Sequence, residues 1–99
     1  MQVVFKLVVH AGIGMSSEDR IFSHVVDMPF LPPVGMEVCD GGWCATVESL
    51  CFANNQLFAF AAPNRCDARV GFRTKKTLDA LSEDYIAEGW QPSDRLLGV

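Results

Sequence analysis

The spacing of apolar side chains changes once along this chain, from every second residue to every third or fourth. Residues 3–9 and 65–73 place apolar side chains at every second position, which predicts strands with one buried face. From Thr74 or Thr77 to Glu88 the spacing is helical instead. The apolar stripe of that segment comprises Leu78, Leu81, Tyr85 and Ile86. Gly89 suits the left-handed residue just past a helix end, and Trp90 can fold back onto the last turn.

Between these segments, prolines and glycines divide the chain into short pieces. Ser16–Met28 has apolar spacing that fits either a helix or a strand, and we favour a strand that returns antiparallel beside residues 3–9. Pro29, Pro32 and Pro33 stop either element, so residues 29–35 should form an extended connector. Its apolar side chains are expected to tuck beneath it, namely Phe30, Leu31 and Val34.

Residues 36–62 predict a meander of three strands. Asp40-Gly41-Gly42 supplies the positive-φ residues of a tight hairpin between strands 36–39 and 43–53. In the second of these strands the inward residues change from Trp43, Ala45 and Val47 to Leu50 and Phe52. One extra residue near Glu48-Ser49, a β-bulge, explains this change. Asn54-Asn55-Gln56 forms the next turn, and strand 57–62 follows it.

The fold class is therefore mostly β (α+β), in a single domain over residues 1–99. We expect a small antiparallel barrel or a strongly twisted sheet of five to six strands, with one C-terminal helix that closes one side or end. This order resembles small SH3-like or OB-like barrels in architecture alone, and fold does not give function. Trp43 and Trp90 are predicted to lie in the core.

Composition and charge limit the binding partners and the cellular location that we expect for this chain. The net charge of −4 argues against a generic nucleic-acid coat, and 49% hydrophobic residues suffice for a buried core. Lys6 interrupts the apolar N-terminal run, which therefore predicts a core strand rather than a signal peptide. No run reaches the roughly 20 residues of a membrane span, so we expect no membrane partner. Since the sequence shows no export signal, we expect a cytoplasmic protein. Its four cysteines should then be reduced thiols, namely Cys39, Cys44, Cys51 and Cys66.

Five of the eight lysines and arginines lie within residues 65–76. This basic strip consists of Arg65, Arg69, Arg73, Lys75 and Lys76. On a strand, the three arginines project from one face and suit phosphates or an acidic partner surface. A solvated outer face is the competing interpretation, and we favour it.

The sequence predicts no metal site and no cofactor. Four, six and fourteen residues separate consecutive cysteines, whereas structural zinc sites usually use two pairs with two to four residues between the ligands. Cys39 and Cys44 span the Gly-Gly hairpin as one loose pair without a second. An enzymatic alternative would need Cys44, His24 and an acid to meet in one pocket.

Strand 57–62 is apolar on both faces, so both faces need a cover. The cover is either the interior of the domain plus the helix, or a second copy. We therefore predict a non-catalytic protein-interaction module that self-associates, with Leu57, Phe58 and Phe60 at the interface. Binding of nucleic acid or another polyanion through the basic strip is the alternative, and a cysteine-based enzyme is a residual one.

Overall fold

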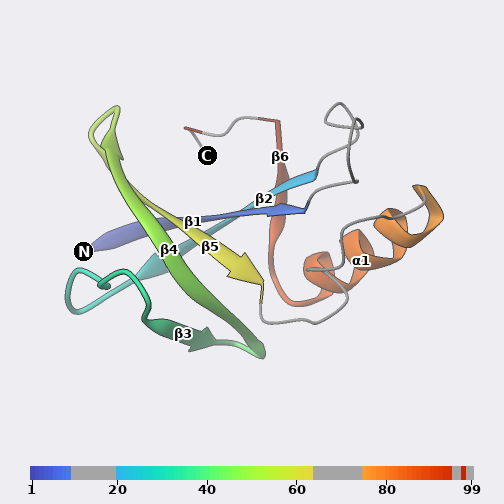
Figure 1. Cartoon of the computed structure of the whole chain (residues 1–99), viewed down its shortest axis with the longest axis horizontal. Coiled ribbons are helices and arrows are strands. Elements are labelled where there is room, and N and C mark those ends of the chain that lie inside the picture. The colour runs from blue at the N-terminus through green and yellow to red at the C-terminus, as the bar shows by residue number, and fades with distance from the viewer. Residues whose placement is uncertain (10–19, 64–74, 95–96, 98–99) are drawn as a thin grey trace.

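The computed structural model describes residues 1–9, 20–63, 75–94 and 97, and within them it contains six strands and one helix (Figure 1). In chain order these are β1 (Gln2–Val9), β2 (Arg20–Asp27), β3 (Glu37–Asp40), β4 (Trp43–Ala53), β5 (Gln56–Pro63), α1 (Lys75–Ala87) and β6 (Gln91–Ser93). The ambiguous segment before Met28 thus contains a strand, as predicted. The predicted strand 65–73 lies outside the described residues.

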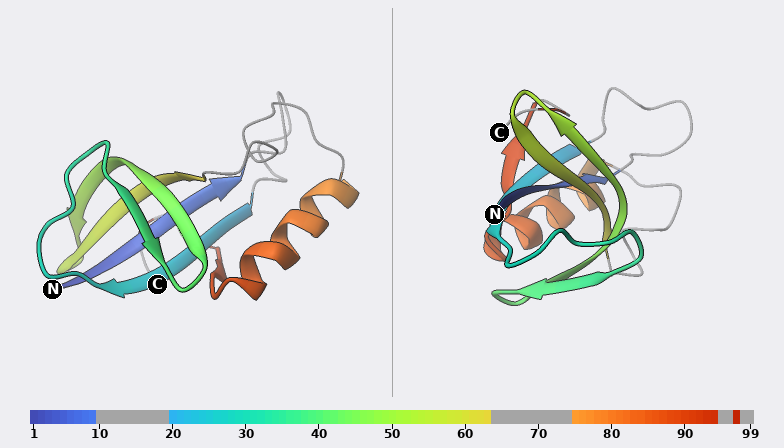
Figure 2. Two further views of the ribbon diagram at one scale, coloured as in Figure 1. Left: turned by 90° about the horizontal axis from the view of Figure 1, so that it is seen from below. Right: turned by 90° about the vertical axis from the view of Figure 1, so that its left-hand side faces the viewer.

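The six strands form one sheet in the order β3-β4-β5-β1-β2-β6. Four of its neighbouring pairs are antiparallel, as expected, but β1 and β5 run parallel. The parallel pair arises because the chain crosses from β2 to the far edge at β3 and then meanders back to β1. Figures 1 and 2 show the strong twist of the sheet, in which β4 crosses β1 and β2 at a steep angle. The mostly β class and the twisted sheet are confirmed, whereas the sheet is not closed into a barrel.

One face of the sheet carries the core. It contains the alternating β1 residues Val3, Phe5, Leu7 and Val9, the β2 residues Phe22 and Val26, the β4 residues Trp43, Ala45 and Val47, and Ala59 and Ala61 of β5. The inward set predicted for the start of β4 is therefore confirmed. Trp43 and Trp90 are each 2% exposed, which confirms their place in the core.

The opposite face of β1 is buried too, which the sequence analysis did not expect. Lys6 is 1% exposed and Val4 is 3% exposed. The prediction of a polar outer face for this strand was therefore wrong, and Lys6 Nζ donates to the hydroxyls of Ser23 on β2 and Ser93 on β6.

Both predicted hairpin turns and the predicted bulge are present. Gly41 and Gly42 have φ of +56° and +93° and join Asp40 to its cross-strand partner Trp43. These values fit the type I′ turn that the twist of two antiparallel strands favours. Asn54 and Asn55, also at positive φ, join β4 to β5 in the same way.

The bulge corrects the register of β4. The pairing with β5 shifts between Val47 and Ser49, which leaves Glu48 as the extra residue. Leu50 packs against the core after the bulge, as predicted. Phe52 does not: it is 73% exposed, because it lies one residue pair from the end of the hairpin, beyond the core.

Helix α1 ends in the expected Schellman arrangement. The Trp90 N–H donates to the Tyr85 carbonyl at 3.0 Å, and the Gly89 N–H donates to the Ile86 carbonyl at 3.0 Å. Gly89 has φ of +100° and Tyr85 is buried. Ile86, however, is half exposed, so its assignment to the apolar stripe was wrong. The helix packs against β2 and the short β6 (Figure 2), and Ser82 and Tyr85 are its buried residues among those whose side chains the structure describes.

The connector between β2 and β3 differs from the prediction. Phe30, Leu31 and Val34 are exposed, and Pro32 is the residue buried beneath the connector. The connector is held to β4 by backbone hydrogen bonds, including one from the Gly35 N–H to the Val47 carbonyl at 2.7 Å. No helix within the described residues has the length and apolar character to cross a bilayer.

Candidate functional site

The basic strip is mostly outside the part of the chain that the structure describes. Arg65, Arg69 and Arg73 fall in the stretch 64–74, while Lys75 and Lys76 open α1 and have no described side-chain positions. The predicted anion-binding surface is therefore untested and stays a prediction.

Of the predicted interface residues, Phe58 has no exposed surface in a single chain. Leu57 and Phe60, its neighbours on β5, are half-buried. Ala59 is also fully buried, so the chain itself covers the middle of this strand on both faces. Any interface formed by β5 must therefore use Leu57 or Phe60 rather than Phe58.

Two exposed apolar side chains, Met1 and Phe52, lie where β1 and β5 begin and β4 ends. A cavity of about 320 Å³ lies there, lined by Met1, Gln2, Val4, Phe52, Asn55, Gln56 and Leu57. We refer to these seven residues as the apolar end. Met1 is 60% exposed and Phe52 73% exposed. The lining contains no ionisable side chain. The terminal amine of Met1 donates to the Met28 carbonyl at 2.8 Å and pairs with the Asp27 carboxylate at 3.3 Å.

A second candidate lies on the β3–β4 hairpin. Cys39 and Cys44 are direct cross-strand partners with Cα atoms 4.1 Å apart, and their sulfurs form a disulfide. The prediction that these two residues are reduced thiols is therefore wrong for this structure. It considered only the expected compartment, whereas the tight turn at Gly41-Gly42 places the two side chains opposite each other on one exposed face.

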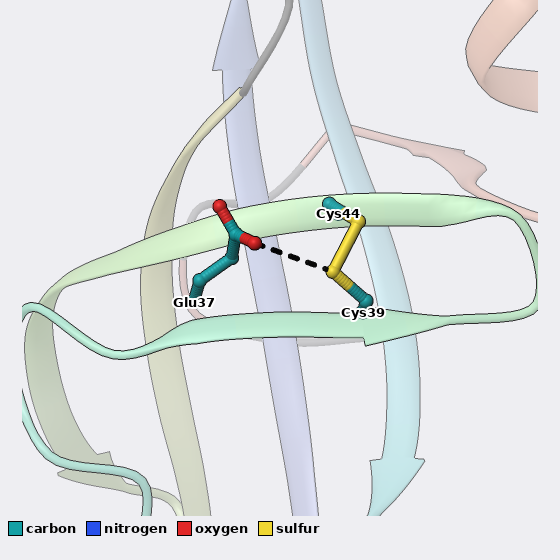
Figure 3. Close-up of side chains that lie close together, drawn as sticks. All are labelled: Glu37, Cys39 and Cys44. Atoms are coloured by element: carbon teal, nitrogen blue, oxygen red, sulfur yellow. Dashed lines mark hydrogen bonds between the residues drawn. A yellow bond between two sulfur atoms is a disulfide. The ribbon is translucent and has the colours of Figure 1, made fainter.

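Glu37 lies beside these two cysteines, and we refer to Glu37, Cys39 and Cys44 as the hairpin cluster. As Figure 3 shows, Glu37 and Cys39 from β3 and Cys44 from β4 point towards one another on the same face of the hairpin. Glu37 Oε1 lies 3.6 Å from Cys39 Sγ. This contact is a hydrogen bond only when Cys39 is a thiol, since a disulfide sulfur carries no proton. The ligand atoms of all three residues lie within 4.8 Å of one another, and all three residues are exposed.

The structure does not bring Cys44 and His24 together. Neighbouring residues of a strand point to opposite faces, and Trp43 is buried while Cys44 is exposed. His24 lies on the Trp43 side, with its ring 5.1 Å from that of Trp43 and 5.5 Å from that of Trp90. The pocket required by the enzymatic alternative is not formed by these two residues.

Lys6 is the buried ionisable group that the sequence analysis missed. Its Nζ donates to the Ser23 hydroxyl at 2.7 Å and to the Ser93 hydroxyl at 3.2 Å. Burial lowers the pKa of Lys6, and the nearby Asp94 carboxylate opposes this shift. A lysine that acts as a nucleophile must reach its substrate, and Lys6 is 1% exposed. Its hydrogen bond to Ser93 instead connects the edge strand β6 to β1 in the interior of the sheet.

Comparison with models of known protein families, with curated proteins and with solved structures gives no match for this chain. Its function must therefore be argued from the apolar end and the hairpin cluster.

Proposed function

We propose that this protein is a non-catalytic interaction module that self-associates through its apolar end. The observation that carries the proposal is the exposed ring of Phe52 beside an apolar cavity of about 320 Å³. Large exposed aromatic side chains next to apolar hollows are typical of interaction surfaces rather than of free protein surface.

A second copy of the chain is the partner that this surface fits. In a twofold symmetric dimer, each surface meets itself, so a patch that carries like charges would repel its own copy. The apolar end has no ionisable side chain, and the terminal amine of Met1 is paired with the Asp27 carboxylate. It also carries a projecting ring and a hollow side by side, so that Phe52 of each copy can enter the cavity of the other.

The size of the effect follows from the area that dimerisation would cover. Burying an exposed phenylalanine contributes about 1.5–3 kcal/mol, and a symmetric dimer buries two of them. Loss of both rings should therefore weaken dimerisation by about 3 kcal/mol or more, which is more than a hundredfold in Kd.

Size-exclusion chromatography with light scattering tests the proposal. We expect wild-type protein at tens of micromolar to be a dimer and Phe52→Ser to be a monomer with unchanged circular dichroism, since Phe52 contributes little to the fold. The matched control is Phe30→Ser, which removes an exposed phenylalanine from the β2–β3 connector and should leave the dimer intact. A monomeric wild type would refute the proposal, as would equal loss of dimer in both variants.

The cytoplasm is the location that we propose for this module. In a reducing compartment, Cys39 and Cys44 would be thiols rather than a disulfide. Fractionation of cells with an antibody against the chain tests the location.

A further inference from the structure

We propose that Glu37, Cys39 and Cys44 form a redox-gated site for a thiophilic divalent metal ion of the Zn²⁺ class. The reduced hairpin would bind the ion, and formation of the Cys39–Cys44 disulfide would release it. This inference is independent of the apolar end, because none of its three residues lines that cavity.

The hairpin geometry places the three ligands without any help from the rest of the chain. Glu37 and Cys39 are two residues apart on β3 and so share a face. Cys39 and Cys44 are directly opposite each other in the ladder, next to the Asp40–Trp43 pair that closes the turn. The face they share is exposed, so an ion can reach it from solvent.

One of the three distances between ligand atoms already matches tetrahedral coordination. Zn–S bonds of about 2.3 Å and Zn–O bonds of about 2.1 Å at tetrahedral angles place a sulfur and an oxygen ligand about 3.6 Å apart. Cys39 Sγ and Glu37 Oε1 are 3.6 Å apart. The two sulfurs must separate from bonding distance to about 3.8 Å, and rotation about the Cα–Cβ bonds of two exposed side chains can supply this change.

The donor set favours a metal of this class. Two thiolates select thiophilic ions, and one carboxylate oxygen is a common additional ligand of Zn²⁺. Three protein ligands leave a fourth position for water or an external ligand. Free thiols are mostly protonated at neutral pH, so the ion binds by displacing the protons of the two cysteines, and its affinity should rise with pH.

Oxidation and metal binding compete for the same sulfur electrons. A small-molecule disulfide would oxidise the site: one protein thiolate attacks it, a first small thiolate leaves, and the second protein thiolate displaces the other small thiolate. Two electrons thus pass from the protein sulfurs to the small-molecule sulfur–sulfur bond, the Cys39–Cys44 bond forms, and the ion is released. A disulfide cannot replace the two thiolates as ligands, because the ligand form of cysteine is the thiolate.

The experiment is a titration of the full chain with Zn²⁺ against a chromophoric chelator, with and without prior reduction by a phosphine. We expect the reduced protein to bind one equivalent and the oxidised protein to bind none at the same concentrations. Co²⁺ in place of Zn²⁺ should give sulfur-to-cobalt charge-transfer absorption in the reduced protein alone. A reduced wild type that does not bind Zn²⁺ would overturn the proposal.

Matched variants locate the site. Glu37→Gln keeps the shape of the side chain but removes its charge, and it should weaken binding by about 10- to 100-fold, at least as much as the loss of an outer-shell partner does. Cys39→Ser should abolish the one-equivalent binding. The controls Cys51→Ser, a free thiol on β4 outside the cluster, and Glu48→Gln, an exposed acid at the bulge, should bind as wild type does. Unchanged affinity in Glu37→Gln or Cys39→Ser, or loss of binding in Cys51→Ser, would show that the ion is held elsewhere and would refute the assignment.

Discussion

Replacing Gly89 with alanine tests how tightly His24 is held by the two buried tryptophans. Gly89 ends α1 at φ of +100°, and a Cβ atom built on it would lie 3.2 Å from His24 Nε2. The substitution therefore has two costs: the backbone must hold a side chain in a left-handed conformation, and the imidazole must move.

A second glycine separates these two costs. Gly42 has nearly the same backbone conformation, with φ of +93°, but no atom lies within 4 Å of its Cβ position. Gly42→Ala should therefore show the backbone cost alone, about 1–2 kcal/mol. The His24 ring packs 5.1 Å from Trp43 and 5.5 Å from Trp90, and such aromatic pairs contribute about 0.5–1.5 kcal/mol each. Displacing the ring by a few tenths of an ångström should weaken these aromatic contacts. We therefore expect Gly89→Ala to lower the free energy of unfolding by about 2–3 kcal/mol.

Urea unfolding of the oxidised proteins, followed by tryptophan fluorescence and circular dichroism, measures both variants. The expected difference of about 1 kcal/mol corresponds to about 4–8 °C in Tm for a domain of this size. Equal destabilisation by Gly89→Ala and Gly42→Ala would refute the reasoning, because it would show that His24 moves aside at no cost.

Three further predictions concern the buried lysine, the disulfide and the basic strip. Because burial lowers the pKa of Lys6 in the folded protein, the unfolded chain binds more protons between that lowered pKa and 10.5, so stability should rise with pH across this window. Lys6→Met should flatten the rise in urea unfolding measured at several pH values, and an unchanged slope would contradict the assignment. Reduction of the Cys39–Cys44 disulfide should lower the free energy of unfolding by at most about 2 kcal/mol, since it closes a very short loop; a much larger loss, measured by unfolding with and without reductant, would mean that the hairpin depends on the bond. If the basic strip binds polyanions, affinity for single-stranded DNA should fall steeply with salt and fall again on replacing Arg69 and Arg73 with alanine; fluorescence anisotropy that shows no binding, or no effect of the variant, would end that hypothesis.

Much of the local structure could be predicted from the sequence because it depends on residues that are close along the chain. The alternation in β1, the positive-φ turns at Gly41-Gly42 and Asn54-Asn55, and the end of α1 at Gly89 all follow from the conformational preferences of single residues. The bulge at Glu48 was also predictable, since one extra residue in a period-two pattern must be left out of the ladder.

The hairpin cluster was predictable in principle and was missed. A two-residue turn at Gly41-Gly42 pairs Asp40 with Trp43, and therefore Cys39 with Cys44. Glu37 then joins them through the period of two on β3. Cysteine spacing alone does not resemble zinc knuckles, so the disulfide and the approach of Glu37 become apparent only from this register.

Which side chains of a strand are buried depends on the elements that pack around it, and this was decided only in the tertiary structure. Lys6 is 1% exposed on the face of β1 opposite the core, where it donates to Ser23 of β2 and Ser93 of β6, residues that lie far from it in the sequence. Phe58 of β5, the partner of Val4, is buried on the same face, while Phe52, equally apolar, is exposed at the end of the hairpin. A period-two pattern assigns residues to faces of a strand, but the exposure of each face depends on long-range contacts that no local pattern contains.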